Sequence, residues 1–298
     1  MPSWDEIINE IQQTNPYTVV RRKYISKLHE ETHRNIICYY SGFLSKTVGQ
    51  LSIADEDMTG FMTAVKDMDT SLGLDLVLHT PGGNPTATEA IVKYLRSKFG
   101  IDIRVIVPQI AMSAGTMIAC AGKEIVMGKQ SSLGPIDPQI IGMAAFNIKK
   151  VFLDAQEALR VNPQDTAYWA IQLQKYPPSL IYDCVNAISL SSELVENWLI
   201  EGMFYGDPTA EEKARTVVSN LNQNEDSKTH GRHFDKELCK SYGLKIVDLE
   251  DDGNILQDAV LSVHHAYMAV LSNTSTVKII ENQMGKMYAL QQNIPPTT

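Results

Sequence analysis

Several features that define broad classes of protein are missing from this chain of 298 residues. No apolar stretch approaches the roughly twenty residues that a membrane-spanning helix needs, so we expect no membrane insertion. Positive charge is in deficit, with 26 Lys and Arg against 35 Asp and Glu. The resulting net charge of −9 argues against nucleic acid or an anionic membrane as the main partner. The first residues hold no basic stretch followed by an apolar core, so no signal peptide is expected.

Cysteine is scarce, and its placement excludes the usual metal and redox motifs. Cys38, Cys120, Cys184 and Cys239 are far apart and form no C-x-x-C pair. Cys38 and Cys120 lie in apolar runs, which is typical of buried thiols. No His, Asp or Glu cluster has metal-ligand spacing, so no metal is expected. Unpaired thiols fit a reducing compartment, and we therefore expect a cytoplasmic protein.

The chain does contain a regular alternation of apolar strands and amphipathic helices. Its 44% hydrophobic and 20% charged residues are typical of a folded globular protein. Strands are predicted at residues 35–40, 74–79, 101–107 and 124–127, and helices at residues 55–69, 86–99 and 113–121. Strand and helix at this spacing indicate right-handed βαβ units, and hence an α/β fold with a parallel sheet covered on both faces.

The second half of the chain is predicted to be mainly helical. Helices are expected at residues 147–160, 165–175, 180–203, 209–222, 234–242 and 256–272, with one short strand at 244–249. We divide the chain into an N-terminal helical segment (1–34), one α/β domain (35–272) and a polar C-terminal tail (273–298). A capping box at Ser3 opens a short helix in the first segment. The basic run that starts at Arg21 is interpreted as a solvated helix face.

Two loops lie at the carboxyl ends of neighbouring predicted strands. Gly82 and Gly83 follow strand 74–79, and Ser113 follows strand 101–107 at the start of a helix. Ligand sites in parallel α/β sheets lie beyond the carboxyl ends of the strands, so we expect the two loops to share one site.

These loops supply two of the groups that acyl transfer needs. The Ser113 hydroxyl lies at a helix N-terminus, where the dipole and free amides favour negative charge. The amides of Ala114 and of Gly82 or Gly83 are the natural donors to an oxyanion. The simpler interpretation makes Ser113 a helix cap and the glycines a turn. The pairing of both loops at one sheet edge makes that interpretation the weaker one.

The same segments resemble a family of serine peptidases. Residues 78–83 (Leu-His-Thr-Pro-Gly-Gly) resemble the Ser-Pro-Gly-Gly turn of Clp-type and signal-peptide-peptidase-A-type enzymes, and residues 113–119 resemble their nucleophile helix. Residues 132–136 (Ser-Leu-Gly-Pro-Ile) resemble the segment that follows. The chain is most similar to the serine dehydrogenase proteinase (SDH) family, over roughly residues 35–270.

The resemblance implies a fold, an activity and an assembly. The expected fold is the ClpP/crotonase-like repeated βαβ superhelix with a mainly helical C-terminal part. The expected activity is peptide-bond hydrolysis of a peptide or protein substrate without a cofactor, in a homo-oligomer.

The general base is not settled by the resemblance. Clp-type enzymes carry a histidine after the serine strand, and residues 134–138 contain none. Relatives of signal peptide peptidase A use a lysine further along, which points to Lys149 and Lys150. Lys150 is favoured because the next turn of its helix is apolar. A lysine base must be neutral, which requires a lowered pKa.

Other bases and other functions stay open. His230 is an alternative base, Asp137 could orient a base or close a turn, and His79 could line the pocket or cap its strand. The leading prediction is a cytoplasmic serine peptidase that forms an acyl-enzyme on Ser113. A crotonase-type acyl-CoA enzyme would use the same oxyanion hole on a thioester. A non-catalytic scaffold with the ClpP fold would need no base.

Overall fold

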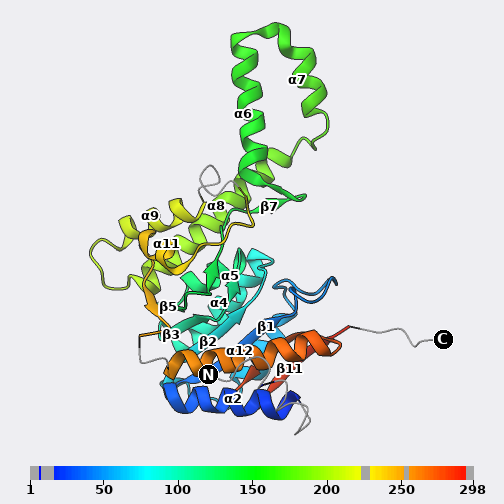
Figure 1. Cartoon of the computed structure of the whole chain (residues 1–298). Helices are drawn as coiled ribbons and strands as arrows, with labels where there is room; N and C mark the ends of the chain where they lie inside the picture. The colour runs from blue at the N-terminus through cyan, green and yellow to red at the C-terminus, as the bar shows by residue number, and fades with distance from the viewer. Residues whose placement is uncertain (1–6, 8–16, 223–228, 252–254, 293–298) are drawn as a thin grey trace, which may run out of the picture.

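A seven-stranded mixed sheet forms the centre of the protein (Figure 1). The computed structural model describes residues 7, 17–222, 229–251 and 255–292. The sheet consists of β1 (Asn35–Ser41), β2 (Leu74–His79), β3 (Ile103–Val107), β5 (Glu124–Met127), β9 (Ile246–Asp248), β10 (Thr276–Asn282) and β11 (Met287–Gln291), in the order β11-β10-β1-β2-β3-β5-β9. Two short strand pairs join β4 (Ile110–Ala111) with β6 (Ser132–Leu133), and β7 (Gln139–Ile140) with β8 (Met143–Ala144).

Helices account for most of the remaining described residues. The α-helices are α2 (Tyr17–Thr32), α3 (Asp57–Val65), α4 (Pro85–Phe99), α5 (Ala114–Cys120), α6 (Ala145–Val161), α7 (Thr166–Leu173), α8 (Leu180–Trp198), α9 (Ala210–Asn222), α11 (Lys236–Ser241) and α12 (Ile255–Asn273). Short helical segments are η1 (Thr70–Leu72), η2 (Pro163–Asp165) and the π-helical η3 (Leu199–Met203).

The predicted α/β fold and its parallel strands are confirmed. β1, β2, β3, β5 and β9 run parallel to one another, and only β10 and β11 are antiparallel to their neighbours. Parallel neighbours need a crossover, and α4 provides the one between β2 and β3. The carboxyl ends of β2 and β3 therefore meet at one edge of the sheet.

The sheet separates two hydrophobic layers because alternate strand residues point to opposite faces. In β2, Leu76 and Leu78 pack on the face covered by α4, α5 and α8. Val77, between them, packs on the opposite face with α2 and α12. Figure 1 shows α2 and α12 side by side beneath the sheet. All six residues of β2 are buried, which agrees with its mainly apolar sequence, although Asp75 and His79 are among them.

The prediction of a polar tail over residues 273–298 is wrong for the part that the structure describes. β10 pairs with β1, and β11 pairs with β10, so residues 276–291 extend the main sheet. The polar residues of β10 are buried and have partners: Lys278 pairs with Asp57, and Glu281 pairs with Arg21. Because these partners are distant in sequence, the polar residues of β10 look solvent-exposed when the sequence is considered alone.

Two local predictions also need correction. Arg21 is buried against Glu281, so this part of the basic run is not a solvated helix face. Helix α4 begins at Pro85, one residue before the predicted start at residue 86, and its cap is Asn84, whose side chain accepts from the amides of Thr86 and Ala87. Asn84 caps because Pro85 suits the first helical position. The capping box at Ser3 lies outside the described residues.

A helical arm projects from the body of the molecule (Figure 1). It contains α6 and α7, and the chain returns through α8. Residues of α6 and α8 form a small separate core: Ala145, Ile148, Leu180 and Cys184. Large apolar side chains of the arm are exposed: Leu153, Val161, Tyr168, Ile171 and Tyr182. The arm therefore presents apolar surface that this chain alone does not cover.

Candidate functional site

Ser113 sits on a strained turn between strand β4 and helix α5. Its backbone has φ 53° and ψ −115°, a region that a residue with a side chain rarely occupies. The Ser113 side chain makes no capping hydrogen bond with helix α5. This arrangement does not suit an ordinary cap, which has β-region dihedral angles and accepts from the first turn. A serine in a strained strand-to-helix turn is the geometry that exposes a nucleophilic hydroxyl.

The glycine turn lies directly against Ser113. The Thr80 amide donates to Ile110 O (3.1 Å) and the Met112 amide donates to Thr80 O (3.1 Å), which joins the two loops. A Cβ added to Gly82 would lie 2.7 Å from Ser113 Cβ and 2.7 Å from Met112 O. No side chain fits there, so Gly82 has to be glycine. The expectation that both loops reach one site agrees with this contact.

The amides around Ser113 differ in their availability. The Gly82 amide lies 3.2 Å from Thr80 Oγ1 and donates to it. Among the backbone hydrogen bonds of the described residues, neither the Gly83 amide nor the Ala114 amide has an acceptor. These two N–H groups belong to the two loops that meet at Ser113.

Thr116 ties the serine helix to the following segment, a role that the sequence did not suggest. Its Oγ1 accepts from the Gly134 amide at 3.0 Å and lies 2.9 Å from Gly134 O. Gly134 in turn leaves space for Met112, whose Cε would be 2.4 Å from an added Cβ. The segment that resembles the peptidase motif therefore packs against the residue before Ser113.

A second residue that sequence reasoning missed is Ile53. Its amide donates to Gly82 O (2.8 Å), and its carbonyl accepts from the Asn84 amide (2.9 Å). Ile53 thus holds the glycine turn from the side as a parallel bridge. No sequence motif marks this residue, because every residue except proline has a backbone N–H and C=O, whatever its side chain.

The two predicted lysines lie in the first turns of α6. The Lys150 side chain is 63% exposed, and its Nζ is 3.9 Å from Asp154 Oδ1. Lys149 is half-buried. For neither lysine does the structure give a hydrogen bond to Ser113, so their role as base stays a prediction.

His230 and Asp137 form a preassembled pair. His230 Nδ1 lies 2.7 Å from Asp137 Oδ1, and Gln139 Nε2 donates to Asp137 Oδ2 at 3.0 Å. Asp137 is 1% exposed, whereas His230 is 29% exposed. A buried carboxylate bonded to one nitrogen of a partly exposed imidazole leaves the other nitrogen available to act as a base.

His230 and Asp137 lie in two segments that adjoin the strained turn at Ser113. Leu133 and Phe234 exchange backbone hydrogen bonds of 3.0 and 2.9 Å, which aligns residues 229–234 with residues 132–137. An added Cβ on Gly134 would lie 3.6 Å from Arg232 O. Gly134 thus lies beside both Met112, which precedes Ser113, and Arg232, which is two residues from His230.

His79 is neither a pocket-lining residue nor a strand cap. It is buried, and its ring packs between those of Phe43 (4.9 Å) and His264 (5.3 Å). Burial lowers the pKa of His79 to about 4, so the ring is neutral near pH 7. His79 therefore belongs to the core beneath the glycine turn.

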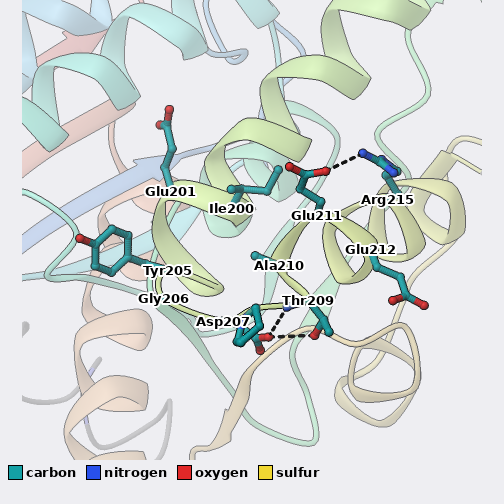
Figure 2. A pocket seen from close by; sticks show the side chains of 11 residues that line it. Ile200, Glu201, Tyr205, Gly206, Asp207, Thr209, Ala210, Glu211, Glu212 and Arg215 are labelled. Carbon is teal, nitrogen blue, oxygen red and sulfur yellow. Dashed lines mark hydrogen bonds and ion pairs between the residues drawn. The ribbon is translucent and has the colours of Figure 1, made fainter.

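A surface pocket of about 760 Å³ lies apart from these residues (Figure 2). It is lined by η3, the following loop and the start of α9, and by none of the predicted site residues. Most of its charged groups are paired: Glu201 with Arg96, Asp207 with Lys213, and Glu211 with Arg215. We assign no chemistry to this pocket.

Within the described part of the chain, no three His, Cys, Asp or Glu side chains gather as metal ligands would. No helix there is both long and apolar enough to cross a membrane.

A parallel βαβ sheet that leads into a strained serine, with a glycine turn against it, is the arrangement that the resemblance to ClpP-like serine peptidases implies. Residues 7–280 match the ClpP-like SDH-type serine proteinases, and the chain belongs to this family. The resemblance predicted from the sequence is thereby confirmed.

Two curated relatives are uncharacterized proteins of Methanocaldococcus jannaschii. One is 31% identical over 167 residues, which are 56% of this chain and 51% of that protein. The other is 41% identical over 88 residues, which are 30% of each chain. The chain thus spans about half the length of the first relative and under a third of the second.

Proposed function

We propose that this protein is a serine peptidase that hydrolyses peptide bonds through an acyl-enzyme on Ser113. The observation that carries the proposal is the strained Ser113 backbone, with φ 53°, packed directly against Gly82. Strain of about 1–3 kcal/mol persists only where the surrounding structure enforces it, and it concentrates at functional sites. Family membership favours a peptidase over the acyl-CoA alternative and over a scaffold.

The oxyanion hole is assigned to the Gly83 and Ala114 amides. Ser113 Oγ attacks the substrate carbonyl carbon, and the carbonyl π electrons move to oxygen to form a tetrahedral oxyanion. Two N–H groups from the adjoining loops stabilise this charge, and the absence of a side chain at Gly82 lets the two loops meet. In this proposal Gly82 is not an oxyanion donor, because its own amide donates to Thr80 Oγ1. It contributes through its lack of a side chain.

His230 is the base that the geometry supports best. In the proposed reaction it accepts the Ser113 proton and then gives it to the leaving amine as the C–N bond breaks. Asp137 holds the imidazole in the required tautomer through the bond to Nδ1. Water then attacks the acyl-enzyme, with His230 again as base, and releases the acid and free Ser113.

Lys149 and Lys150 are the competing bases. The predicted Ser-Lys dyad needs a desolvated amine, whereas the Lys150 side chain is exposed beside Asp154. For this reason we rank the lysines below the His230–Asp137 pair.

Labelling with a fluorophosphonate tests the nucleophile, because the probe reacts only with an activated serine. Wild type should be labelled at Ser113, and Ser113→Ala should not be. Labelling that persists in Ser113→Ala would refute the assignment of the nucleophile.

Four variants separate the bases. His230→Ala and Asp137→Asn should slow labelling and peptide cleavage by about 10³-fold or more, as loss of a triad member does. His233→Ala is the matched control, because His233 lies three residues away and is bonded to Ser132 instead. Full activity of His230→Ala, with loss in Lys149→Ala or Lys150→Ala, would establish the Ser-Lys dyad instead.

The remaining expectations are proposals about context. We propose a peptide or protein substrate, a cytoplasmic location and a homo-oligomer. The exposed apolar side chains of the helical arm support assembly, because contiguous apolar surface usually marks an interface.

A further inference from the structure

A buried ion pair lies behind the glycine turn, outside the groups that the proposed reaction uses. Lys278 of β10 and Asp57 of α3 are both fully buried, and Lys278 Nζ lies 2.8 Å from Asp57 Oδ1 and 3.1 Å from Oδ2. Tyr39 donates its hydroxyl to Asp57 Oδ2 at 2.8 Å. A buried charge pair stabilises a fold little more than apolar residues of the same volume would, so its presence calls for another reason.

The pair reaches the backbone on both sides of Ile53. Lys278 Nζ donates to Ser52 O at 2.8 Å. The Ala54 amide donates to Asp57 Oδ2 at 3.1 Å. The cation therefore holds the residue before Ile53 and the anion holds the residue after it.

Ile53 passes this constraint to the glycine turn. It bonds to Gly82 O and to the Asn84 amide through its own backbone. A Cβ added to Gly83 would lie 2.3 Å from Ile53 N and 2.3 Å from Ile53 O, so the two backbones are in contact. Since Gly83 lies between the two residues that Ile53 bonds, the direction of its amide depends on where Ile53 is held.

We propose that Lys278 and Asp57 are positioning residues that set the oxyanion turn through Ile53. The charge pair can do what apolar side chains cannot, because it donates to one backbone carbonyl and accepts from one backbone amide at fixed directions. The inference rests on the proposed function, since it concerns the donors of the same site.

The test removes the whole buried network at once. The variant Lys278→Met/Asp57→Leu/Tyr39→Phe leaves no unpaired side-chain charge or hydroxyl from this network in the core, so it is expected to fold. The matched control is Arg21→Met/Glu281→Leu. This second buried pair uses the same strand, β10, and joins it to α2, away from Ile53.

Two measurements on the full chain distinguish the outcomes. Hydrogen exchange followed by mass spectrometry should show the Ile53 and Asn84 amides exchanging at least tenfold faster in the triple variant only. The limiting rate of Ser113 labelling should fall by about 10- to 100-fold, with a smaller change in the probe concentration for half-maximal rate. The control should keep the wild-type labelling rate.

Each failure has its own meaning. Unchanged exchange and labelling in a folded triple variant would overturn the positioning role, as would equal losses in the control. If wild type is not labelled at Ser113, the proposed function fails, while the exchange measurement still tests the link from the ion pair to the turn. Should the triple variant not fold, Asp57→Asn keeps a side-chain acceptor for Ala54 and must show smaller changes in the same direction; no change would refute the inference.

Discussion

Acidification is expected to destabilise the fold beneath the glycine turn at a pH where carboxylates are not yet fully protonated. His79 ends β2, immediately before Thr80 and the glycine turn, and its ring is buried among aromatic neighbours. Those neighbours are Tyr40 of β1, Phe43 and His264 of α12, with ring centroids 5.6, 4.9 and 5.3 Å away. None of them is an acid, so a proton on His79 has no adjacent carboxylate to stabilise it.

The size of the effect follows from the pKa of His79. Burial lowers it to about 4 in the folded protein, against about 6.5 in the unfolded chain. The unfolded chain therefore binds the extra proton first, and stability that is fully present above about pH 6.5 is lost as the pH falls toward 4. Between pH 7.5 and 5.0 we expect His79 alone to lower the free energy of unfolding by about 2 kcal/mol. His264 adds to the slope, because burial and the neighbouring His79 and His265 lower its pKa as well.

Urea unfolding at pH 7.5 and pH 5.0 measures this loss, and His79→Phe isolates it. Phenylalanine fills a similar volume and cannot be protonated, so the variant should lose about 2 kcal/mol less than wild type over the same pH range. The comparison subtracts the carboxylates, which titrate equally in both proteins. Equal losses in wild type and His79→Phe would refute the argument that the buried ring controls acid stability.

Two further predictions concern the turn and the assembly. Gly82→Ala should reduce labelling of Ser113 by at least about 100-fold, because its Cβ would meet backbone at 2.7 Å and its φ is +100°. Gly100→Ala, with φ +59° and open space around its Cβ, should cost about 1 kcal/mol of stability and leave labelling unchanged; equal inactivation would show that strain alone matters. Light scattering should give a multiple of 33.2 kDa, and Tyr168→Ser/Ile171→Ser on the arm should lower it, whereas Val19→Ser on α2 should not. A monomeric wild type would contradict the homo-oligomer.

The parallel half of the sheet could be predicted because its information is local. β2 and β5 are short, mainly apolar strands, and helix α4 is followed by Gly100, so periodicity and stop signals suffice. β10 could not be predicted in the same way. Its Lys278 and Glu281 read as solvated until Asp57 and Arg21, more than 200 residues away in the chain, are placed beside them.

The candidate site likewise contains some residues that local motifs predict and others that they do not. Ser113 and the glycine turn stand in contiguous motifs, and their expected proximity agrees with the contact between Gly82 and Ser113. His230 stands in a polar segment, which by itself does not distinguish a base from a surface residue. Its pairing with Asp137 depends on the bridge between Leu133 and Phe234, which brings together residues about a hundred positions apart.

The proposed chemistry therefore depends on contacts that no motif contains. The glycine turn can supply an oxyanion hole only if its amides point at the carbonyl oxygen, and a glycine-rich loop is the backbone least able to hold a direction by itself. In this fold the direction is supplied from outside the turn, by Ile53 and by the Thr80 bridge to Ala111. The residues on either side of Ile53 are bonded to side chains of α3 and β10, and β10 lies far along the chain from the motifs that contain Ser113 and the glycine turn. Residues 276–282 thus have a physical reason to lie within the peptidase fold and not outside it.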